Sequence, residues 1–336
     1  MNPDFTTVIN NYNYARFLRR AIDSVLDQDD PPQLVVVDDG SSDGSRQIIE
    51  SYGDALRAIF LKNGGQARAC LAAMAEVTTS HVHFLDADDA MAPGFAVAIR
   101  KVLVDNPAKV QVQMRAVDAQ GVPLGSVFPT FPSGYDSKAM LGDIAGWGIP
   151  ISPPTSGNVF RADVVQRIAS GYDYEKAIDG VILYLAPTMG SVVSINRPLV
   201  DYCIHGTNEH QQHVLSADRM RREIRRMDHR IDHFRRLTAD GGVGKGKLLG
   251  QQQEWAMLAM VAEGKRPPVA ALTAYCRSLW RSSLAPKRSL SLMAWAGLLT
   301  VLHDPARRSL AAWRLSSANR PSIRDILPLP RFGRAR

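Results

Sequence analysis

The chain has few cysteines and no long apolar run. Its 336 residues include three cysteines, Cys70, Cys203 and Cys276, an odd number at distant positions. This argues against a disulfide framework or a zinc site and favours a reducing compartment. No apolar segment reaches the about 20 residues that a membrane-spanning helix needs. No segment typical of a signal peptide opens the sequence, so we expect a cytoplasmic location.

Acidic residues are scarce in the second part of the chain. Residues 1–209 hold 16 Lys and Arg against 24 Asp and Glu (net −8), whereas residues 210–336 hold 24 against 9 (net +15), which together make the overall +7. This asymmetry indicates an interaction surface, for which an anionic membrane and a nucleic acid are the obvious partners. Aromatic residues are not interleaved with the basic ones in a stacking pattern, which argues against nucleic acid.

One segment of this basic part is apolar. Residues 290–302 lie between Lys287-Arg288 and Arg307-Arg308. The segment could lie in the membrane interface with Trp295 at the level of the headgroups, so that the protein binds the inner face of the cell membrane peripherally. Alternatively, it is a core helix that packs on other helices. We therefore predict a first domain over residues 1–210 and a basic helical region over residues 211–336.

The first hundred residues alternate between short apolar runs and amphipathic stretches. The pattern predicts strands over residues 7–9, 34–37, 58–61 and 81–85, and helices over residues 16–27, 46–52, 66–76 and 95–103. Such alternation predicts right-handed βαβ units, and therefore an α/β fold with a mainly parallel sheet.

Polar residues directly follow three of the predicted strands. They are Asn10–Asn13, then Asp38-Asp39, then the acidic motif Asp86-Ala87-Asp88-Asp89. The carboxyl ends of parallel strands form the edge of the sheet where ligands bind. Carboxylates crowded at such an edge repel one another unless a divalent cation holds them, and that cation can bind a diphosphate. The alternative is a solvated acidic turn after a strand.

Five motifs in this order resemble those of family 2 glycosyltransferases. They occupy residues 8–13, 21–28, 36–43, 63–68 and 85–89, beginning with Val-Ile-Asn-Asn-Tyr-Asn and ending with Leu-Asp-Ala-Asp-Asp. The resemblance extends over residues 5–210. It implies a GT-A fold, which binds nucleotide sugars on a Rossmann-like sheet, together with a nucleotide-sugar donor, a divalent metal (Mn²⁺ or Mg²⁺) and inversion at the anomeric carbon.

The resemblance also implies how the nucleotide is held. Asn10 and Tyr12 would line the base pocket, and Asp39 would accept a hydrogen bond from the uracil or the ribose. Arg68 would reach the pyrophosphate. Asp86 would face both the ribose and the metal. An arginine and a cation at this place would neutralise the negative charge of the leaving nucleoside diphosphate.

Metal ligands follow from the same resemblance. Asp86 and Asp88 would hold the metal, Asp88 directly, and Asp89 would either assist or cap the next turn. Residues 202–208 resemble the closing motif Tyr-x-x-His-Gly-x-Asn of many such enzymes. His205 would therefore ligate the metal or contact the diphosphate, although a lone histidine is more often structural.

The middle of the chain is predicted to form the acceptor side. Residues 121–157 are dense in Gly and Pro, which opposes regular elements and indicates either a linker or a flap over the site. Inverting transfer needs a carboxylate that takes the proton of the attacking hydroxyl. The resemblance assigns this role to Asp179, with Asp173 and Glu175 in reserve. The alternative for Asp179 is an ordinary helix N-cap.

These patterns predict an inverting, metal-dependent glycosyltransferase of the hexosyltransferase type. It would transfer a sugar, with a UDP-sugar as the expected donor, to a glycan or lipid-linked acceptor in cell-surface polysaccharide synthesis. Two other classes stay open, namely a sugar-nucleotide-binding scaffold without catalysis and a nucleotidyltransferase. The latter would need a glycine-rich, basic phosphate loop near the first strand, and residues 10–13 do not form one.

Overall fold

The computed structural model describes residues 4–168, 178–205, 215–238 and 248–315. The described residues group into two units. The first comprises those within Met1–Ile144, Pro150–His205 and His229–Val243, and the second those within Ala145–Ile149, Gly206–Asp228 and Gly244–Arg336. Each unit has a buried hydrophobic core. The division at residue 210 drawn from the sequence stays a prediction.

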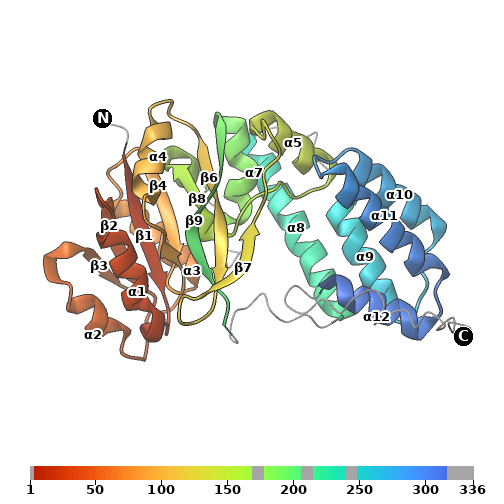
Figure 1. Ribbon diagram of the computed structural model, residues 1–336, viewed down its shortest axis with the longest axis horizontal. Coiled ribbons are helices and arrows are strands. Elements are labelled where there is room, and N and C mark those ends of the chain that lie inside the picture. The colour runs from red at the N-terminus through yellow and green to blue at the C-terminus, as the bar shows by residue number, and fades with distance from the viewer. Residues whose placement is uncertain (1–3, 169–177, 206–214, 239–247, 316–336) are drawn as a thin grey trace, which may run out of the picture. The chain divides into compact units, whose positions relative to one another are not determined.

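The first unit is built on a mixed sheet (Figure 1). The order of its described strands is β3-β2-β1-β4-β8-β6-β9-β5, and β7 pairs with β6. The first four strands of the chain run parallel to one another. The strands are β1 (Phe5–Asn11), β2 (Gln33–Asp38), β3 (Arg57–Phe60), β4 (His81–Asp86), β5 (Ala90–Met91), β6 (Lys109–Val117), β7 (Pro123–Phe128), β8 (Asn158–Arg161) and β9 (Val192–Cys203).

Helices cover both faces of this sheet. One face packs against α1 (Ala15–Leu26), α2 (Ser45–Glu50) and α4 (Phe95–Leu103). The other face packs against α3 (Gln66–Ala73), α6 (Ala162–Ile168) and α7 (Asp179–Met189). The predicted α/β architecture is confirmed, and each helix and strand predicted in the first hundred residues is present with ends shifted by a few residues.

Burial on both faces explains the continuous apolar run of β2. Val36 packs in the core under α1 and α4, whereas Val35 and Val37 pack in the core under α3 and α7. Because successive side chains of a strand point to opposite faces, a strand covered on both sides favours apolar residues at successive positions.

Residues 121–157 form more regular structure than their content of Gly and Pro predicts. They contain β7 and α5 (Ser137–Gly146), so the expectation that regular elements are lacking here is wrong. Pro123 begins β7 at the edge of the sheet, where its missing N–H is tolerated. Tyr135 Oη donates to Asp143 Oδ2 (2.7 Å) and accepts from the Ile151 N–H (2.7 Å), which ties both sides of α5 together.

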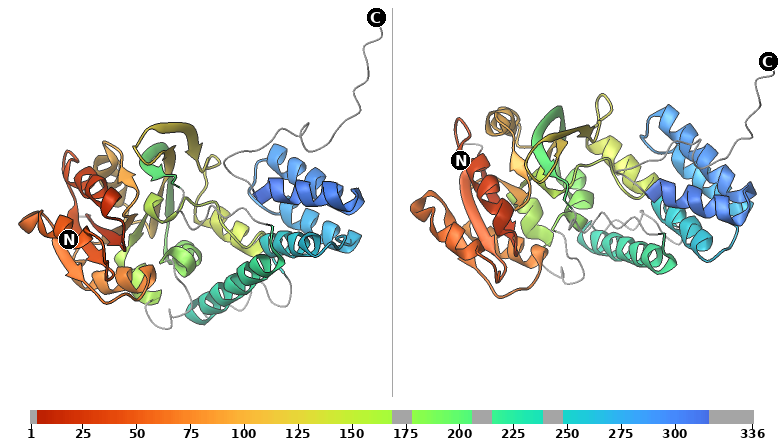
Figure 2. Two further views of the ribbon diagram at one scale, coloured as in Figure 1. Left: turned by 90° about the horizontal axis from the view of Figure 1, so that it is seen from below. Right: turned by 60° about the horizontal axis from the view of Figure 1, so that its bottom comes forward.

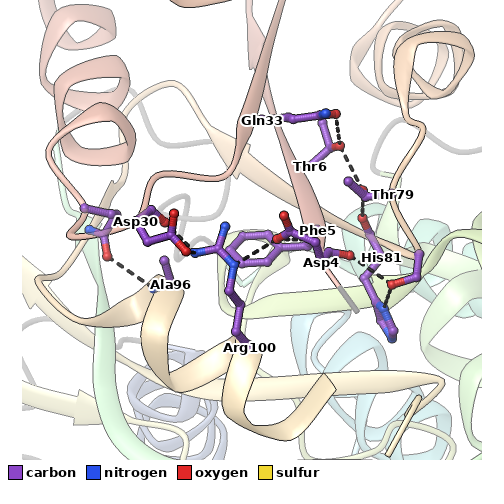
Figure 3. Close-up of polar contacts among 11 residues, drawn as sticks. Asp4, Phe5, Thr6, Asp30, Gln33, Thr79, His81, Ala96 and Arg100 are labelled. Carbon is purple, nitrogen blue, oxygen red and sulfur yellow. Dashed lines mark hydrogen bonds and ion pairs between the residues drawn. The ribbon is translucent and has the colours of Figure 1, made fainter. Parts of the chain in front are cut away.

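Polar contacts hold the amino ends of the parallel strands (Figure 3). Arg100 of α4 forms ion pairs with Asp4 (3.0 Å) and Asp30 (2.9 Å). Thr6 of β1 is hydrogen-bonded to Thr79, with 2.9 Å between the two hydroxyl oxygens. These side chains join α4, β1 and the segment before β4 at the edge opposite to the carboxyl ends of the strands.

The second unit is helical in its described residues. It contains α9 (Gly250–Ala262), α10 (Val269–Trp280), α11 (Pro286–Val301) and α12 (Asp304–Leu315), and these helices pack against one another (Figure 2). The residues of α8 (Ala217–Thr238) are divided between the two units. None of the helices described here combines the length and the apolar character needed to cross a membrane.

Trp295 of α11 is buried. Only 4% of its surface is exposed, and its indole N–H donates to the Leu310 carbonyl (3.2 Å). The prediction that this tryptophan lies at the level of the lipid headgroups is therefore wrong. The alternative is confirmed, because the apolar segment forms a core helix of the second unit.

Candidate active site

The register of the central strands brings polar residues to one edge of the sheet. Asn10 stands opposite Asp86 in the β1–β4 pair, and Asn11 stands opposite Asp38 in the β1–β2 pair. Asn10 Nδ2 donates to Asp86 Oδ1 (3.0 Å), and Asn11 Nδ2 donates to Asp38 Oδ1 (2.7 Å). The carboxyl ends of β2, β1 and β4 are thus joined through their side chains.

Asp39 holds the loop that follows β3. Its Oδ1 accepts the Gly64 N–H (2.8 Å) and its Oδ2 accepts the Gly65 N–H (2.7 Å). Gly40 permits this close approach, because its φ is +76° and a Cβ there would lie 2.8 Å from the Asn63 nitrogen. These two bonds join distant segments and could not be predicted from the sequence. The predicted role of Asp39 toward a nucleotide stays a prediction.

Asp86 is the centre of the polar contacts at this edge. Its Oδ1 accepts from Gln66 Nε2 (2.6 Å) as well as from Asn10, and its backbone N–H donates to Ser156 Oγ (3.0 Å). Burial and the charge of Asp88 raise the pKa of Asp86 to about 7. Sequence reasoning missed Gln66 and Ser156 as individual residues, although both lie in segments that carry the family resemblance.

Asp88 and His205 meet although they are 117 positions apart. His205 Nε2 lies 2.8 Å from Asp88 Oδ2. Arg16 Nη2 lies 3.3 Å from the other ring nitrogen, Nδ1. Because a guanidinium can only donate, Nδ1 accepts in this contact and Nε2 donates its proton to Asp88. The Phe17 ring packs on the imidazole, with 4.7 Å between the ring centroids.

Asp89 points into the protein. It is 1% exposed, and its Oδ1 accepts the Cys203 N–H of β9 (2.9 Å). Burial and the charges of Asp88 and Asp86 raise its pKa well above the ordinary range. Arg20 of α1 donates to the Asp88 carbonyl (2.6 Å). The acidic motif is therefore attached to α1 and β9, and Asp89 serves that attachment.

Asp179 lies close to these carboxylates. Burial raises the pKa of the Cys70 thiol well above its ordinary range, and the charges of Asp86, Asp179 and Asp39 add to this effect. Three of the predicted site carboxylates are thus within electrostatic reach of one buried thiol on α3. Asp179 is the first residue of α7, and Ile178 is the N-cap. The N-cap alternative for Asp179 is therefore wrong.

Lys109 lies within electrostatic reach of Asp179. It is fully buried on β6, and its Nζ donates to Gln111 Oε1 (2.7 Å) and Ser152 Oγ (2.9 Å). Burial lowers the pKa of Lys109 to about 7, and the charge of Asp179 opposes that shift. The sequence analysis missed this residue, because nothing local marks a lysine at the start of a strand as buried.

Two predicted nucleotide contacts are exposed. Tyr12 has 47% of its surface accessible, and Arg68 projects from the first turn of α3. Neither side chain forms a hydrogen bond or ion pair with another described residue, so both are available to a ligand. Asp173 and Glu175, the reserve candidates for the base, lie outside the described residues.

In the described part of the chain, side chains that could ligate a metal ion meet in pairs. In the part of the chain that the structure describes, no three His, Cys, Asp or Glu side chains are gathered so that they could hold a metal ion. Asp88 and His205 meet, whereas Asp86 Oδ1 is engaged by Asn10 and Gln66. The predicted set of Asp86, Asp88 and His205 therefore stays a prediction.

The Asp86→Asn variant is expected to be more stable than the wild type at neutral and alkaline pH without divalent cations. An acid whose pKa rises from 3.8 to about 7 on folding stabilises the fold at low pH. That contribution is lost as the pH rises through about 7, where the ionised group opposes folding. Asp86 is partly exposed, so solvent screening reduces the effect to about 2 kcal/mol.

Urea unfolding of both proteins at about pH 5 and about pH 8 measures this difference. The advantage of the variant should grow between the two pH values. Asp105→Asn, at an exposed position on the same unit, is the matched control and should show no such growth. An advantage that is equal at both pH values would show that the pKa of Asp86 is not raised.

Comparison with solved structures identifies the fold. The crystal structure of residues 1–349 of Staphylococcus aureus TarS, in complex with UDP-GlcNAc, is similar over 92% of this chain and 90% of that chain, with a TM-score of 0.52 and 16% identity. This likeness shows the fold, and the predicted GT-A fold is confirmed.

Sequence comparisons agree with the resemblance to a glycosyltransferase family. Residues 6–133 match the model of the family described as glycosyl transferase family 2. The uncharacterized glycosyltransferase alr2836 of Nostoc sp. PCC 7120 is 33% identical over 215 residues, which cover 61% of this chain and 66% of that protein. The putative teichuronic acid biosynthesis glycosyltransferase TuaG of Bacillus subtilis is 33% identical over 92 residues, 26% of this chain and 36% of that protein.

These matches confirm the resemblance drawn from the motifs. Residues 6–133 match the glycosyl transferase family 2 model, and the relatives named here carry the name glycosyltransferase. The chain spans just under two thirds of the length of alr2836 and about a third of TuaG.

Proposed function

We propose that the protein is an inverting glycosyltransferase that transfers a sugar from a UDP-sugar to a hydroxyl group of a glycan or lipid-linked acceptor. The observation that carries this proposal is the meeting of Asn10, Asp86, Asp88 and His205 at one strand edge. TarS, of the same fold, binds UDP-GlcNAc, which supports the donor class. TuaG and the minor teichoic acid biosynthesis protein GgaA of Bacillus subtilis support a role in cell-surface polymer synthesis.

In this proposal the donor lies along the carboxyl ends of β1, β2 and β4. The exposed ring of Tyr12 packs on the base, and Asn10 lies beside it. Asp39 has lone pairs left after its two bonds to the loop and accepts from the uracil or the ribose. Arg68 reaches the diphosphate from the start of α3, where the positive end of the helix also favours an anion.

Asp88 and His205 are the residues that would hold a divalent cation, Mg²⁺ or Mn²⁺. They fit this role, because a carboxylate oxygen and an imidazole nitrogen meet at 2.8 Å, and neutral His205 can ligate through Nε2 when its proton lies on Nδ1, in place of the contact with Arg16. Mg²⁺ commonly takes one or two protein carboxylates and completes its coordination with substrate phosphates and water. When bound, the cation neutralises the charge of the leaving diphosphate.

Asp179 acts on the acceptor. Its carboxylate takes the proton of the acceptor hydroxyl while that oxygen attacks the anomeric carbon, and the bond between that carbon and the diphosphate oxygen breaks on the opposite face. The new glycosidic bond therefore has the inverted configuration. Buried Lys109 lies within electrostatic reach of Asp179, and Arg68 remains with the nucleoside diphosphate.

The proposal also includes a place for the reaction. A lipid-linked acceptor would be met at the inner face of the cell membrane, to which the basic residues 211–336 would bind peripherally.

Thermal unfolding with a panel of nucleotide sugars, each with and without Mn²⁺, tests the proposed donor and cation. A ligand that binds only the folded state stabilises it by about 2.7 kcal/mol at a hundred times its Kd. UDP-sugars with Mn²⁺ should raise the Tm most, and GDP-sugars should have little effect. A panel in which no nucleotide sugar raises the Tm would contradict the proposal.

The same samples separate the alternative functions. A glycosyltransferase slowly releases UDP and free sugar when water replaces the acceptor, whereas a scaffold without catalysis binds the donor and releases neither. A nucleotidyltransferase would instead release pyrophosphate from a nucleoside triphosphate and a sugar phosphate.

A further inference from the structure

The hairpin of α10 and α11 carries positive charge without acidic residues. Between Glu263 and Asp304 the chain has six basic residues and no Asp or Glu; they are Lys265, Arg266, Arg277, Arg281, Lys287 and Arg288. Lys265 is paired with Glu263 (2.9 Å), and Arg314 of α12 is paired with Glu254 (3.0 Å). Because residues 264–303 contain no Asp or Glu, the field of the hairpin is positive.

Large apolar side chains are also exposed on both helices near the connection between them. Trp280, the last residue of α10, is 81% exposed, and Leu290, near the start of α11, is 61% exposed. Trp280 and Leu290 both lie near the connection, because α10 ends at Trp280, α11 begins at Pro286, and the two helices pack against each other. Among the tryptophans of this unit, Trp147 and Trp295 are buried, Trp255 and Trp313 are half-buried, and Trp280 is exposed.

Basic and apolar side chains share the same helix faces. Arg277, Trp280 and Arg281 follow the spacing of i, i+3 and i+4, which places them on one side of α10, and all three are exposed. On α11, Lys287 and Leu290 are three positions apart and are both exposed. We call these five residues the hairpin tip.

We propose that the hairpin tip binds an anionic lipid surface. Trp280 and Leu290 enter the headgroup region, where an indole has its apolar body in the membrane and its N–H near water. Arg277, Arg281 and Lys287 contact the lipid phosphates. Charge complementarity favours this partner, because three cations around an apolar centre match an anionic interface. The inference deepens the membrane association of the proposed function and assigns it to Trp280 in place of Trp295.

Sedimentation of the full chain with vesicles tests the hairpin tip. The protein should bind vesicles of phosphatidylglycerol and phosphatidylcholine in equal amounts, and should not bind vesicles of phosphatidylcholine alone. Each cation near an anionic surface strengthens binding about fivefold. Arg277→Gln with Arg281→Gln should therefore weaken binding about 25-fold. High salt should also weaken the binding of the wild type.

Matched variants distinguish the tip from overall charge. Lys101→Gln with Lys138→Gln removes the same charge from exposed positions of the other unit and should leave vesicle binding unchanged. Trp280→Ala should weaken binding about tenfold or more, whereas Trp280→Phe should retain most of it. Quenching of tryptophan fluorescence by brominated lipids should be seen in the wild type and be lost in Trp280→Ala.

Three results would overturn the inference. They are equal binding to neutral and anionic vesicles, equal binding by the tip and control variants, and a change of oligomeric state in the tip variants, which would assign the surface to a second copy of the chain. Stabilisation by UDP-sugars is measured on the same variants and should not change. Loss of vesicle binding with intact donor binding therefore concerns the tip alone, and failure of donor binding concerns the proposed function.

Discussion

The Asp179→Asn variant is expected to transfer sugar about 10²- to 10⁴-fold more slowly than the wild type, because its amide cannot accept the proton of the acceptor hydroxyl. The substitution preserves the size of the side chain and its place as the first residue of α7. Donor binding should persist, since Asp179 faces the acceptor in the proposed arrangement. Initial rates of UDP release measure the transfer, and thermal unfolding with the UDP-sugar measures the binding.

The pair of readouts makes this prediction specific. Asp105→Asn applies the same chemical change at an exposed position and should retain the wild-type rate. Asp179→Glu retains a carboxylate but moves it, and should recover part of the lost rate. A near-normal rate in Asp179→Asn would show that another group is the base, and Asp173 and Glu175 would then be the next candidates to replace.

Replacement of Asp88 by Asn is expected to remove the response to Mn²⁺. An amide oxygen carries no full charge, so the cation would lose its principal anionic ligand while the contact with His205 could still form. We expect the rate of transfer to fall about 100-fold or more, since a cation that neutralises the leaving diphosphate stabilises the transition state by several kcal/mol. Thermal unfolding with UDP should then give the same Tm with Mn²⁺ as without it.

The neighbouring residue provides the matched control for this experiment. Asp89 accepts the Cys203 N–H and is buried, and an Asn there can still accept that bond. Asp89→Asn should therefore bind UDP with the same dependence on Mn²⁺ as the wild type, even if it unfolds at a lower temperature. If Asp88→Asn retained the Mn²⁺ response, the cation would be held elsewhere, and the meeting of Asp88 with His205 would be structural.

The order of strands and helices in the first hundred residues could be predicted from the sequence. Hydrophobic periodicity is a local property, and the four-residue apolar run of β2 and the amphipathic pattern of α1 are visible without any tertiary contact. The acidic motif and the other polar strand ends were visible for the same reason, because parallel strands present their carboxyl ends at one edge. The family resemblance added predicted roles for particular residues at this edge.

Contacts between distant segments were decided by the tertiary structure. Gln66 reaches Asp86 because α3, which joins β3 to β4, packs against β1 and β2. Lys109 is buried with Gln111 and Ser152 as its hydrogen-bond partners. Residues 121–157, rich in Gly and Pro, are a second case in which tertiary contacts decide the local structure. Its residues have low local propensity for regular structure, yet pairing of β7 with β6 outweighs that propensity.

Trp280 and Trp295, two of the four tryptophans in residues 211–336, show most clearly the difference between what the sequence and what the packing determined. The sequence by itself determined an α/β domain with acids at its strand ends and a basic second part that contains an apolar helix. Only packing decided that Trp295 fills the core of that part while Trp280 faces outward. The physical reason is that amphipathicity marks which residues avoid water, whereas the neighbouring helices determine which of those residues they cover.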